Sequence, residues 1–183
     1  DVAIFLDKII RHTAVIPFGG NIVTKDIKTG LAILDKQAEL LKIKFGAAMY
    51  TDDQDNVMVS IPGLRGREPK EIAVKNLSEI IGARMKEIID LVYHEIKVSG
   101  YENKLMTGIV LTGGGSQIKN LQQLYNIEVK SEFAKNISIT MEKNVADEKK
   151  RKMLFKKRKE EYKHQKKLVV VMEEKEKYRE RQP

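Results

Sequence analysis

The sequence has 183 residues, of which 42% are hydrophobic, and this is enough for one medium domain or two small ones with a real core. It contains no cysteine, which excludes a disulfide framework and a thiolate metal site and favours an intracellular protein. The longest apolar runs, such as residues 168–172, are far shorter than the roughly 20 residues that a membrane-spanning helix needs.

The net charge of +8 is concentrated at one end of the sequence. Residues 142–183 hold 16 Lys and Arg against 9 Asp and Glu, whereas the first 141 residues hold 18 against 17. The globular part is therefore expected to be nearly neutral, with a basic tail. The first residues show neither an initiator Met nor the features of a signal peptide, so we expect the sequence to begin inside a longer protein.

The first elements are predicted to be a hairpin followed by a helix. Apolar alternation over residues 2–6 and a β-branched segment over 9–16 are typical of two paired strands. Residues 17–21 contain Pro, Gly and Asn and end the second strand, and mixed spacing over 23–31 then predicts a helix, with Asn21 as a candidate cap.

A second helix is predicted over residues 35–45, with Asp35 as its cap and Gly46 as its stop. Alternation over 57–61 predicts a strand, and the Gly, Arg and Pro-rich segment 62–69 predicts a loop. These elements suggest the rim of a small subdomain.

The longest predicted helix spans residues 76–99, and Asn76 and Glu79 have the spacing of a capping box. A short apolar strand, a glycine-rich loop and a further helix are predicted in that order over residues 109–124. Strand, Gly-rich loop and helix form a common arrangement for binding ligands through the backbone.

The pattern changes after residue 124. Alternation at Ile127 and Val129, and again over 137–141, indicates an irregular or strand-like connector over 126–144. The Lys, Glu and Arg-rich segment 145–183 is predicted to be an exposed helix or a partly disordered tail.

The run RHTAVIPFGGN at residues 11–21 resembles the FtsA family of bacterial cell division proteins, in the segment that comes after its second phosphate loop. Four further segments resemble the same family in the same order, at residues 37–42, 61–67, 81–99 and 108–115. The resemblance covers residues 1–124, and residues 125–183 are interpreted as sequence unrelated to the family.

This resemblance implies an α/β fold: part of the second domain of an actin-like (RNase H-like) ATPase, with a small α/β subdomain and a charged helical or disordered tail. Residues 1–22 and 100–125 would belong to the nucleotide-binding subdomain, and residues 23–99 to the smaller subdomain that docks FtsZ. The connector 126–144 and the tail 145–183 complete the expected organisation.

The glycine-rich loop is the first candidate site. Gly113, Gly114, Gly115 and Ser116 lie between a predicted buried strand and a helix, where backbone N–H groups can approach a ligand. A mere tight turn is the alternative that the residues leave open. The family resemblance implies that this loop contacts the adenosine of ATP.

Glu39 and Lys42 are spaced to share one helix face, and an exposed ion pair is the simple interpretation. The resemblance implies a ribose or adenine contact instead. Gly19 and Gly20 allow a sharp turn into the next helix, and the resemblance places this turn near the nucleotide cleft.

The family binds ATP with Mg²⁺, and Asp1 matches the last residue of its second phosphate loop. The 183-residue chain alone is therefore expected to bind ATP weakly or not at all. We find no catalytic constellation, and the three histidines do not have the spacing of a metal site. An ATPase activity of this chain by itself is not expected.

Arg84 aligns with an arginine in the subdomain that resembles an FtsZ-docking site. FtsZ presents an acidic C-terminal peptide, and a guanidinium can take a carboxylate with two parallel hydrogen bonds. The alternative is a pair with Glu87 one turn away on an exposed face.

The family also implies self-association and a place on the cytoplasmic face of the inner membrane at the division site. Residues 153–158 weakly resemble its basic membrane-contacting helix. Nucleic acid is not an expected partner, because Glu residues interrupt the basic run. Two alternatives remain: an ATPase fragment from another actin-like branch, and a polyanion-binding module that acts through the tail.

Overall fold

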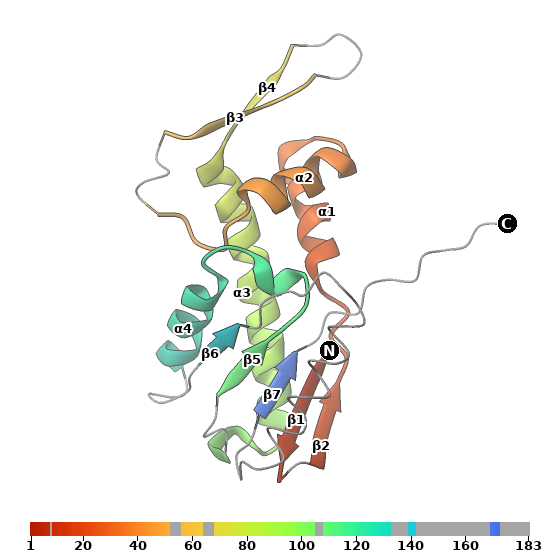
Figure 1. The fold of residues 1–183 in the computed structure, drawn as a ribbon, viewed down its shortest axis with the longest axis vertical. Coiled ribbons are helices and arrows are strands. Elements are labelled where there is room, and N and C mark those ends of the chain that lie inside the picture. Colours follow the sequence, from red (N-terminus) through yellow and green to blue (C-terminus); the bar gives the residue numbers. More distant parts are fainter. Residues whose placement is uncertain are drawn as a thin grey trace, which may run out of the picture.

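The structure is a computed structural model that describes residues 1–7, 9–51, 56–63, 68–104, 108–132, 139–141 and 169–172. Figure 1 shows a five-stranded sheet at one end of the molecule and a two-stranded sheet at the other. The longest helix, α3 (Val74–Val98), extends between the two sheets. In the part of the chain that the structure describes, no helix is long and apolar enough to cross a membrane.

The first two strands form the predicted hairpin. β1 (Val2–Leu6) pairs antiparallel with β2 (Ile9–Ala14), and Asp7 at the turn has a positive φ of 50°. Val2 and Ile4 are buried, as their alternation predicts. β2 ends at Ala14, two residues earlier than expected.

The large sheet has the strand order β2-β1-β7-β5-β6, in which β5 is Ile109–Leu111, β6 is Ile139–Met141 and β7 is Val169–Met172. The expectation of a helix or disorder throughout 145–183 is wrong for β7. Its three successive valines favour a strand. The many charged residues around them indicated an exposed helix or a disordered tail instead, so the strand was not predicted. The other residues of that tail lie outside the described ones.

Helix α1 (Gly20–Leu31) begins three residues before the predicted start. Gly19 is its N-cap, so the expectation that Asn21 caps the helix is wrong. The helix therefore starts directly at the glycine turn. Val23 and Ile27 on its inner face are fully buried.

Helix α2 (Asp35–Phe45) has the predicted bounds, and Gly46 ends it by donating its N–H to Lys42 O at 3.0 Å. Its N-cap is Leu34 rather than Asp35. The Leu34 N–H donates to the Gln37 side chain at 3.1 Å, which satisfies the backbone donor of the N-cap residue.

The small sheet pairs β3 (Met58–Ile61) with β4 (Lys70–Ala73), and β4 was not predicted. Two of its four residues are charged, and only Ile72 is buried, so the strand has no clear apolar alternation. Its pairing with β3 defines it instead.

Because β4 leads straight into α3, this helix begins at Val74 and not at Asn76. The predicted capping box of Asn76 and Glu79 is therefore wrong. The first N–H of the helix donates to Val57 O at 3.0 Å. The apolar stripe was predicted correctly in its main members, and it buries Leu77, Ile81, Ile88, Val92 and Ile96.

After the short η2 (Glu102–Lys104), the predicted order of strand, loop and helix is present as β5, η3 (Gly115–Gln117) and α4 (Leu121–Glu132). Helix α4 continues through Ile127 and Val129, where the connector was expected to be irregular or strand-like. Alternation over so few residues cannot be distinguished from one side of a helix. The strand expected near residue 140 is β6.

Candidate functional site

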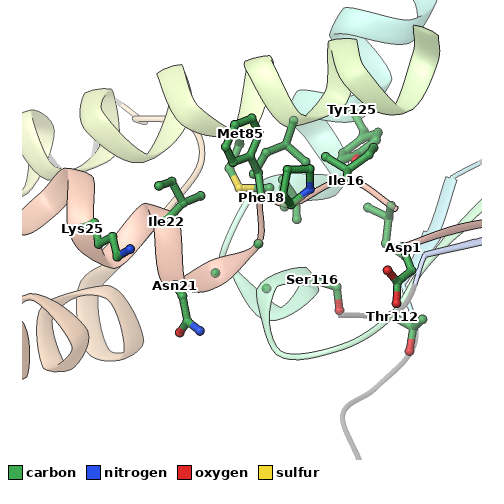
Figure 2. A pocket seen from close by; sticks show the side chains of 17 residues that line it. Asp1, Ile16, Phe18, Asn21, Ile22, Lys25, Met85, Thr112, Ser116 and Tyr125 are labelled. Carbon is green, nitrogen blue, oxygen red and sulfur yellow. The ribbon is translucent and has the colours of Figure 1, made fainter. Parts of the chain in front are cut away.

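Two turns that are distant in sequence line one cavity of about 290 Å³. The turn between β2 and α1 contributes Gly19 and Gly20, and the loop after β5 contributes Gly115 and Ser116. Figure 2 shows the two backbone segments around the cavity, with helix α3 running across the top of the view. Four of the residues predicted for the nucleotide site are therefore brought together.

The cavity is also lined by apolar and polar side chains that were not among the residues predicted for the nucleotide site. The apolar wall includes Ile16, Phe18, Met85, Ile88, Leu121 and Tyr125. Burial raises the pKa of Tyr125, so its hydroxyl stays protonated. Asp1, Asn21, Lys25 and Thr112 supply polar groups, and Figure 2 shows the Asp1 and Thr112 side chains close to Ser116.

The glycine-rich loop is held by its own hydrogen bonds. Gly113 has φ +95°, a left-handed conformation that strongly favours glycine. The buried Ser116 hydroxyl donates to Gly113 O at 2.8 Å, and Gln117 N–H donates to Gly114 O at 3.1 Å. Gly113 and Gly114 thus shape the turn, while Gly115 and Ser116 line the cavity.

Glu39 and Lys42 form the ion pair that their spacing suggested, with 2.8 Å between Lys42 Nζ and Glu39 Oε2. The pair is more than an exposed helix contact. Lys42 Nζ also donates to Gly20 O at 3.0 Å and to Thr24 Oγ1 at 2.8 Å, and Thr24 Oγ1 lies 2.5 Å from Glu39 Oε2. The network fastens α2 to the first turn of α1 beside the cavity: Gly20 lines the cavity, whereas Thr24, Glu39 and Lys42 do not.

This network stabilises the ionised form of the Glu39 carboxylate. Burial acts to raise the pKa of Glu39, but hydrogen bonds from Lys42 and Thr24 and the positive charge of Lys42 outweigh it. The pKa of Glu39 consequently lies below its ordinary value. Glu39 is ionised at neutral pH and holds Lys42 in place.

The guanidinium of Arg84 forms ion pairs with carboxylates of the chain itself. Its Nε and Nη2 donate to the two oxygens of Asp26 at 2.5 and 3.1 Å, and Nη1 donates to Glu87. The hydrogen bond with Asp26 raises the pKa of Arg84. Its guanidinium carbon lies 5.7 Å from the ring centroid of Phe18, which lines the cavity. The Arg84–Glu87 pair is the contact that the sequence analysis gave as the alternative to FtsZ docking. No spacing in the sequence indicated Asp26 as a partner of Arg84.

The segment after α2 is fixed to the loop that comes after η3. Ala48 N–H donates to Lys119 O at 2.8 Å, and the Asn120 amide donates to Met49 O at 3.1 Å. Helix α3 passes very close here, since a Cβ on Gly82 would lie 2.7 Å from Ala48 O. These contacts connect the segment after the glycine-rich loop with the segment after α2, once through the backbone and once through the Asn120 side chain.

Comparison with known proteins identifies the family. The family model described as "Cell division protein FtsA" matches residues 1–162. The chain is 35% identical over 136 residues to cell division protein FtsA of Neisseria meningitidis, covering 72% of the chain and 33% of that relative. It is 38% identical to FtsA of Pseudomonas aeruginosa, covering 68% and 30%, and 33% identical to FtsA of Escherichia coli K12, covering 75% and 36%.

Among solved structures, MreB5 of Spiroplasma citri bound to ADP aligns with a TM-score of 0.59 and 17% identity, covering 86% of this chain and 50% of that one. The same protein bound to AMPPNP aligns with a TM-score of 0.52 and 17% identity, covering 75% and 46%. At this identity the likeness shows the fold alone, which is part of an actin-like ATPase fold.

These findings correct one expectation. The family match continues to residue 162, so the prediction that the sequence beyond residue 124 is unrelated to the family is wrong for residues 125–162. Each of the three curated relatives is matched over about a third of its length. The chain belongs to the FtsA family of cell division proteins.

Proposed function

We propose that this chain forms one side of an ATP site in an FtsA-like division protein. The observation that carries the proposal is the convergence of the Gly19–Gly20 turn and the Gly115–Ser116 loop on one cavity. Backbone turns with no bulky side chain allow close approach of a nucleotide, and a helix starts at each turn or shortly after it. In this proposal the glycine-rich loop contacts adenosine, and Mg²⁺ accompanies the phosphates.

The Glu39–Lys42 network supports the same site. It holds the carbonyl of Gly20, a residue of the cavity wall, by a direct hydrogen bond from Lys42. A ribose or adenine contact by Glu39 or Lys42 stays a prediction. We expect the 183-residue chain alone to bind ATP weakly, because phosphate contacts usually dominate the affinity, and we assign it no catalytic residue.

The site is best tested in a chimera in which this chain replaces the matching part of a full-length FtsA. Gly115→Val places a β-branched side chain at the cavity wall, and we expect at least a tenfold loss of affinity for a fluorescent ATP analogue in a titration. Thr29→Val adds the same side chain at an exposed position of α1 and should leave the affinity unchanged. Equal affinities for both variants, with both proteins folded by circular dichroism, would remove the loop from the site.

We further propose that the whole protein docks the acidic C-terminal peptide of FtsZ at Arg84, associates with further FtsA-like protomers, and works at the cytoplasmic face of the inner membrane at the division site. The family supports this cell division role. Arg84 already presents its guanidinium to carboxylates in the two-oxygen geometry that a peptide would use. Docking would therefore compete with Asp26.

Two variants separate docking from a structural role. Arg84→Gln removes the cation, and Asp26→Asn removes its competitor while keeping the side-chain size. If Arg84 binds the peptide, Arg84→Gln weakens and Asp26→Asn strengthens peptide binding, each by about fivefold or more, in fluorescence anisotropy. If both variants bind the peptide as the unmodified chimera does, Arg84 only joins α1 to α3.

A further inference from the structure

The two glycine turns that line the cavity are far apart in the sequence, and contacts outside the cavity join them. From the first turn, the Gly20 carbonyl accepts a hydrogen bond from Lys42 on α2. The chain that leaves α2 at Gly46 then runs beside the segment after η3, where Ala47 and Lys119 form a parallel β-bridge. The position of the second turn relative to the first therefore depends on what holds these two segments together.

Two hydrogen bonds hold these segments together, and the side chain of Asn120 supplies one of them. Ala48 N–H donates to Lys119 O at 2.8 Å, and the Asn120 amide donates to Met49 O at 3.1 Å. On its other side, the segment after α2 lies against α3, since a Cβ on Gly82 would lie 2.7 Å from Ala48 O. This segment is therefore a firm support, and the hydrogen bond from Asn120 fixes the glycine-rich loop to it.

The backbone of Asn120 forms the turn between the glycine-rich loop and α4. It has a positive φ of 60°, a left-handed conformation that Asn and Asp adopt more readily than most other residues. The Asn120 carbonyl accepts the N–H of Leu124 at 3.0 Å, so α4 begins directly after this turn. Ser116 before the turn and Leu121 and Tyr125 after it line the cavity. One residue thus connects two parts of the cavity wall with the segment after α2.

We propose that Asn120 is a positioning residue of the nucleotide site. Its side-chain amide fixes the glycine-rich loop to the segment after α2, and so sets the distance between Gly115 and Gly20 across the cavity. Asn120 is not itself among the residues that line the cavity, so it acts on the ligand only through the loop. This inference rests on the proposed ATP site, but the effect of Asn120 on the loop is measurable without a nucleotide.

Two substitutions separate the hydrogen bond from the backbone conformation. Asn120→Gly keeps the left-handed conformation without strain and removes the amide. Asn120→Asp keeps the size and shape of the side chain, but its carboxylate cannot donate to Met49 O. The control is Ile96→Val, which removes one methylene group from a fully buried position of α3 that does not line the cavity. It should lower the melting temperature through a packing defect alone.

The effect on the loop is measured by amide hydrogen exchange in the 183-residue chain. The N–H groups of Gln117 and Ile118 donate to carbonyls within the glycine-rich loop. Both should exchange at least fivefold faster in Asn120→Gly and Asn120→Asp, and at about the unmodified rate in Ile96→Val. Unchanged exchange in the two Asn120 variants would overturn the proposal. Faster exchange in Asn120→Gly alone would also overturn it, because backbone freedom and not the amide would then be the cause.

The effect on the site is measured in the FtsA chimera by titration with the fluorescent ATP analogue. Both Asn120 variants should weaken binding by about fivefold, whereas Ile96→Val should bind as the unmodified chimera does. An equal loss in Ile96→Val would attribute the effect to stability and overturn the positioning role. Full affinity in both Asn120 variants, beside a loss in Gly115→Val, would overturn that role and leave the ATP site in place. Full affinity in Gly115→Val would overturn the ATP site itself, and the role of Asn120 with it.

Discussion

Helix α1 is held to its two neighbouring helices by ion-pair clusters that look alike in sequence and differ in structure. Glu39 and Lys42 on α2, and Arg84 and Glu87 on α3, both have i, i+3 spacing. The first cluster reaches the main chain of α1 at Gly20, whereas the second reaches only the Asp26 side chain. Identical spacing on a helix thus gives no indication of which partner lies across the interface.

The side chains of the two cations, Lys42 and Arg84, are buried to different degrees, and this accounts for the difference in the stability loss expected for each cluster. The Lys42 side chain is 12% exposed and that of Arg84 is 22% exposed. Lys42 donates to a backbone carbonyl in the wall of the cavity and to Thr24, and it pairs with Glu39, so its loss removes three polar contacts at once. The Arg84 side chain is more exposed and, on α1, pairs with the Asp26 side chain only. We therefore expect a larger loss of stability when the first cluster is disrupted than when the second is.

The largest effect is expected for Lys42→Met, which keeps the length of the side chain but removes its three polar contacts. Leaving Gly20 O and Glu39 without the ammonium should lower the free energy of unfolding by about 2–3 kcal/mol in urea denaturation. Lys44→Met on the exposed side of the same helix is the control and should change it by less than about 0.5 kcal/mol. Equal losses in both variants would contradict a special role for Lys42.

A smaller effect is expected at the second cluster. Arg84→Gln and Asp26→Asn should each lower the free energy of unfolding by about 1 kcal/mol, because the pair is partly exposed and solvent screens it. In the double variant the losses should not add, since both remove one interaction. Additive losses in thermal or urea unfolding would show that the two side chains act independently.

The smallest effect concerns pH. Because the folded-state pKa of Glu39 is lowered, its stabilisation is complete above the unfolded pKa of about 4.3 and is lost as pH falls through the folded value. Between pH 7 and pH 3 the unmodified chain should therefore lose more stability than Glu39→Gln. The difference is expected to be below about 1 kcal/mol, since the Glu39 side chain is 42% exposed. Parallel stability curves for the two proteins over this range would remove Glu39 from the linkage.

Local pattern was sufficient for much of the fold. The alternation of Val2 and Ile4 predicted a hairpin, and Gly46 predicted the end of α2. The apolar repeat through Ile81, Ile88 and Ile96 predicted the buried face of α3. Each of these features depends on residues close in sequence, so composition and spacing carry the information.

Strands that depend on a distant partner were missed. β4 has only Ile72 buried and is defined by pairing with β3, and β7 is defined by β1 and β5 on either side. The start of α3 at Val74 was missed for the same reason, because β4 delivers the chain directly into the helix. Strand pairing between segments far apart leaves little trace in either segment alone.

For this protein the sequence by itself determined the helices, the hairpin, the glycine-rich loop and, through its motifs, the FtsA family. Only the tertiary structure decided that Gly20 and Gly115 line one cavity, that Asp26 pairs with Arg84, and that β7 completes the sheet. The physical reason is range: helix and turn preferences arise from neighbouring residues, whereas cavities, ion pairs between helices and central strands arise from the packing of segments far apart in the chain.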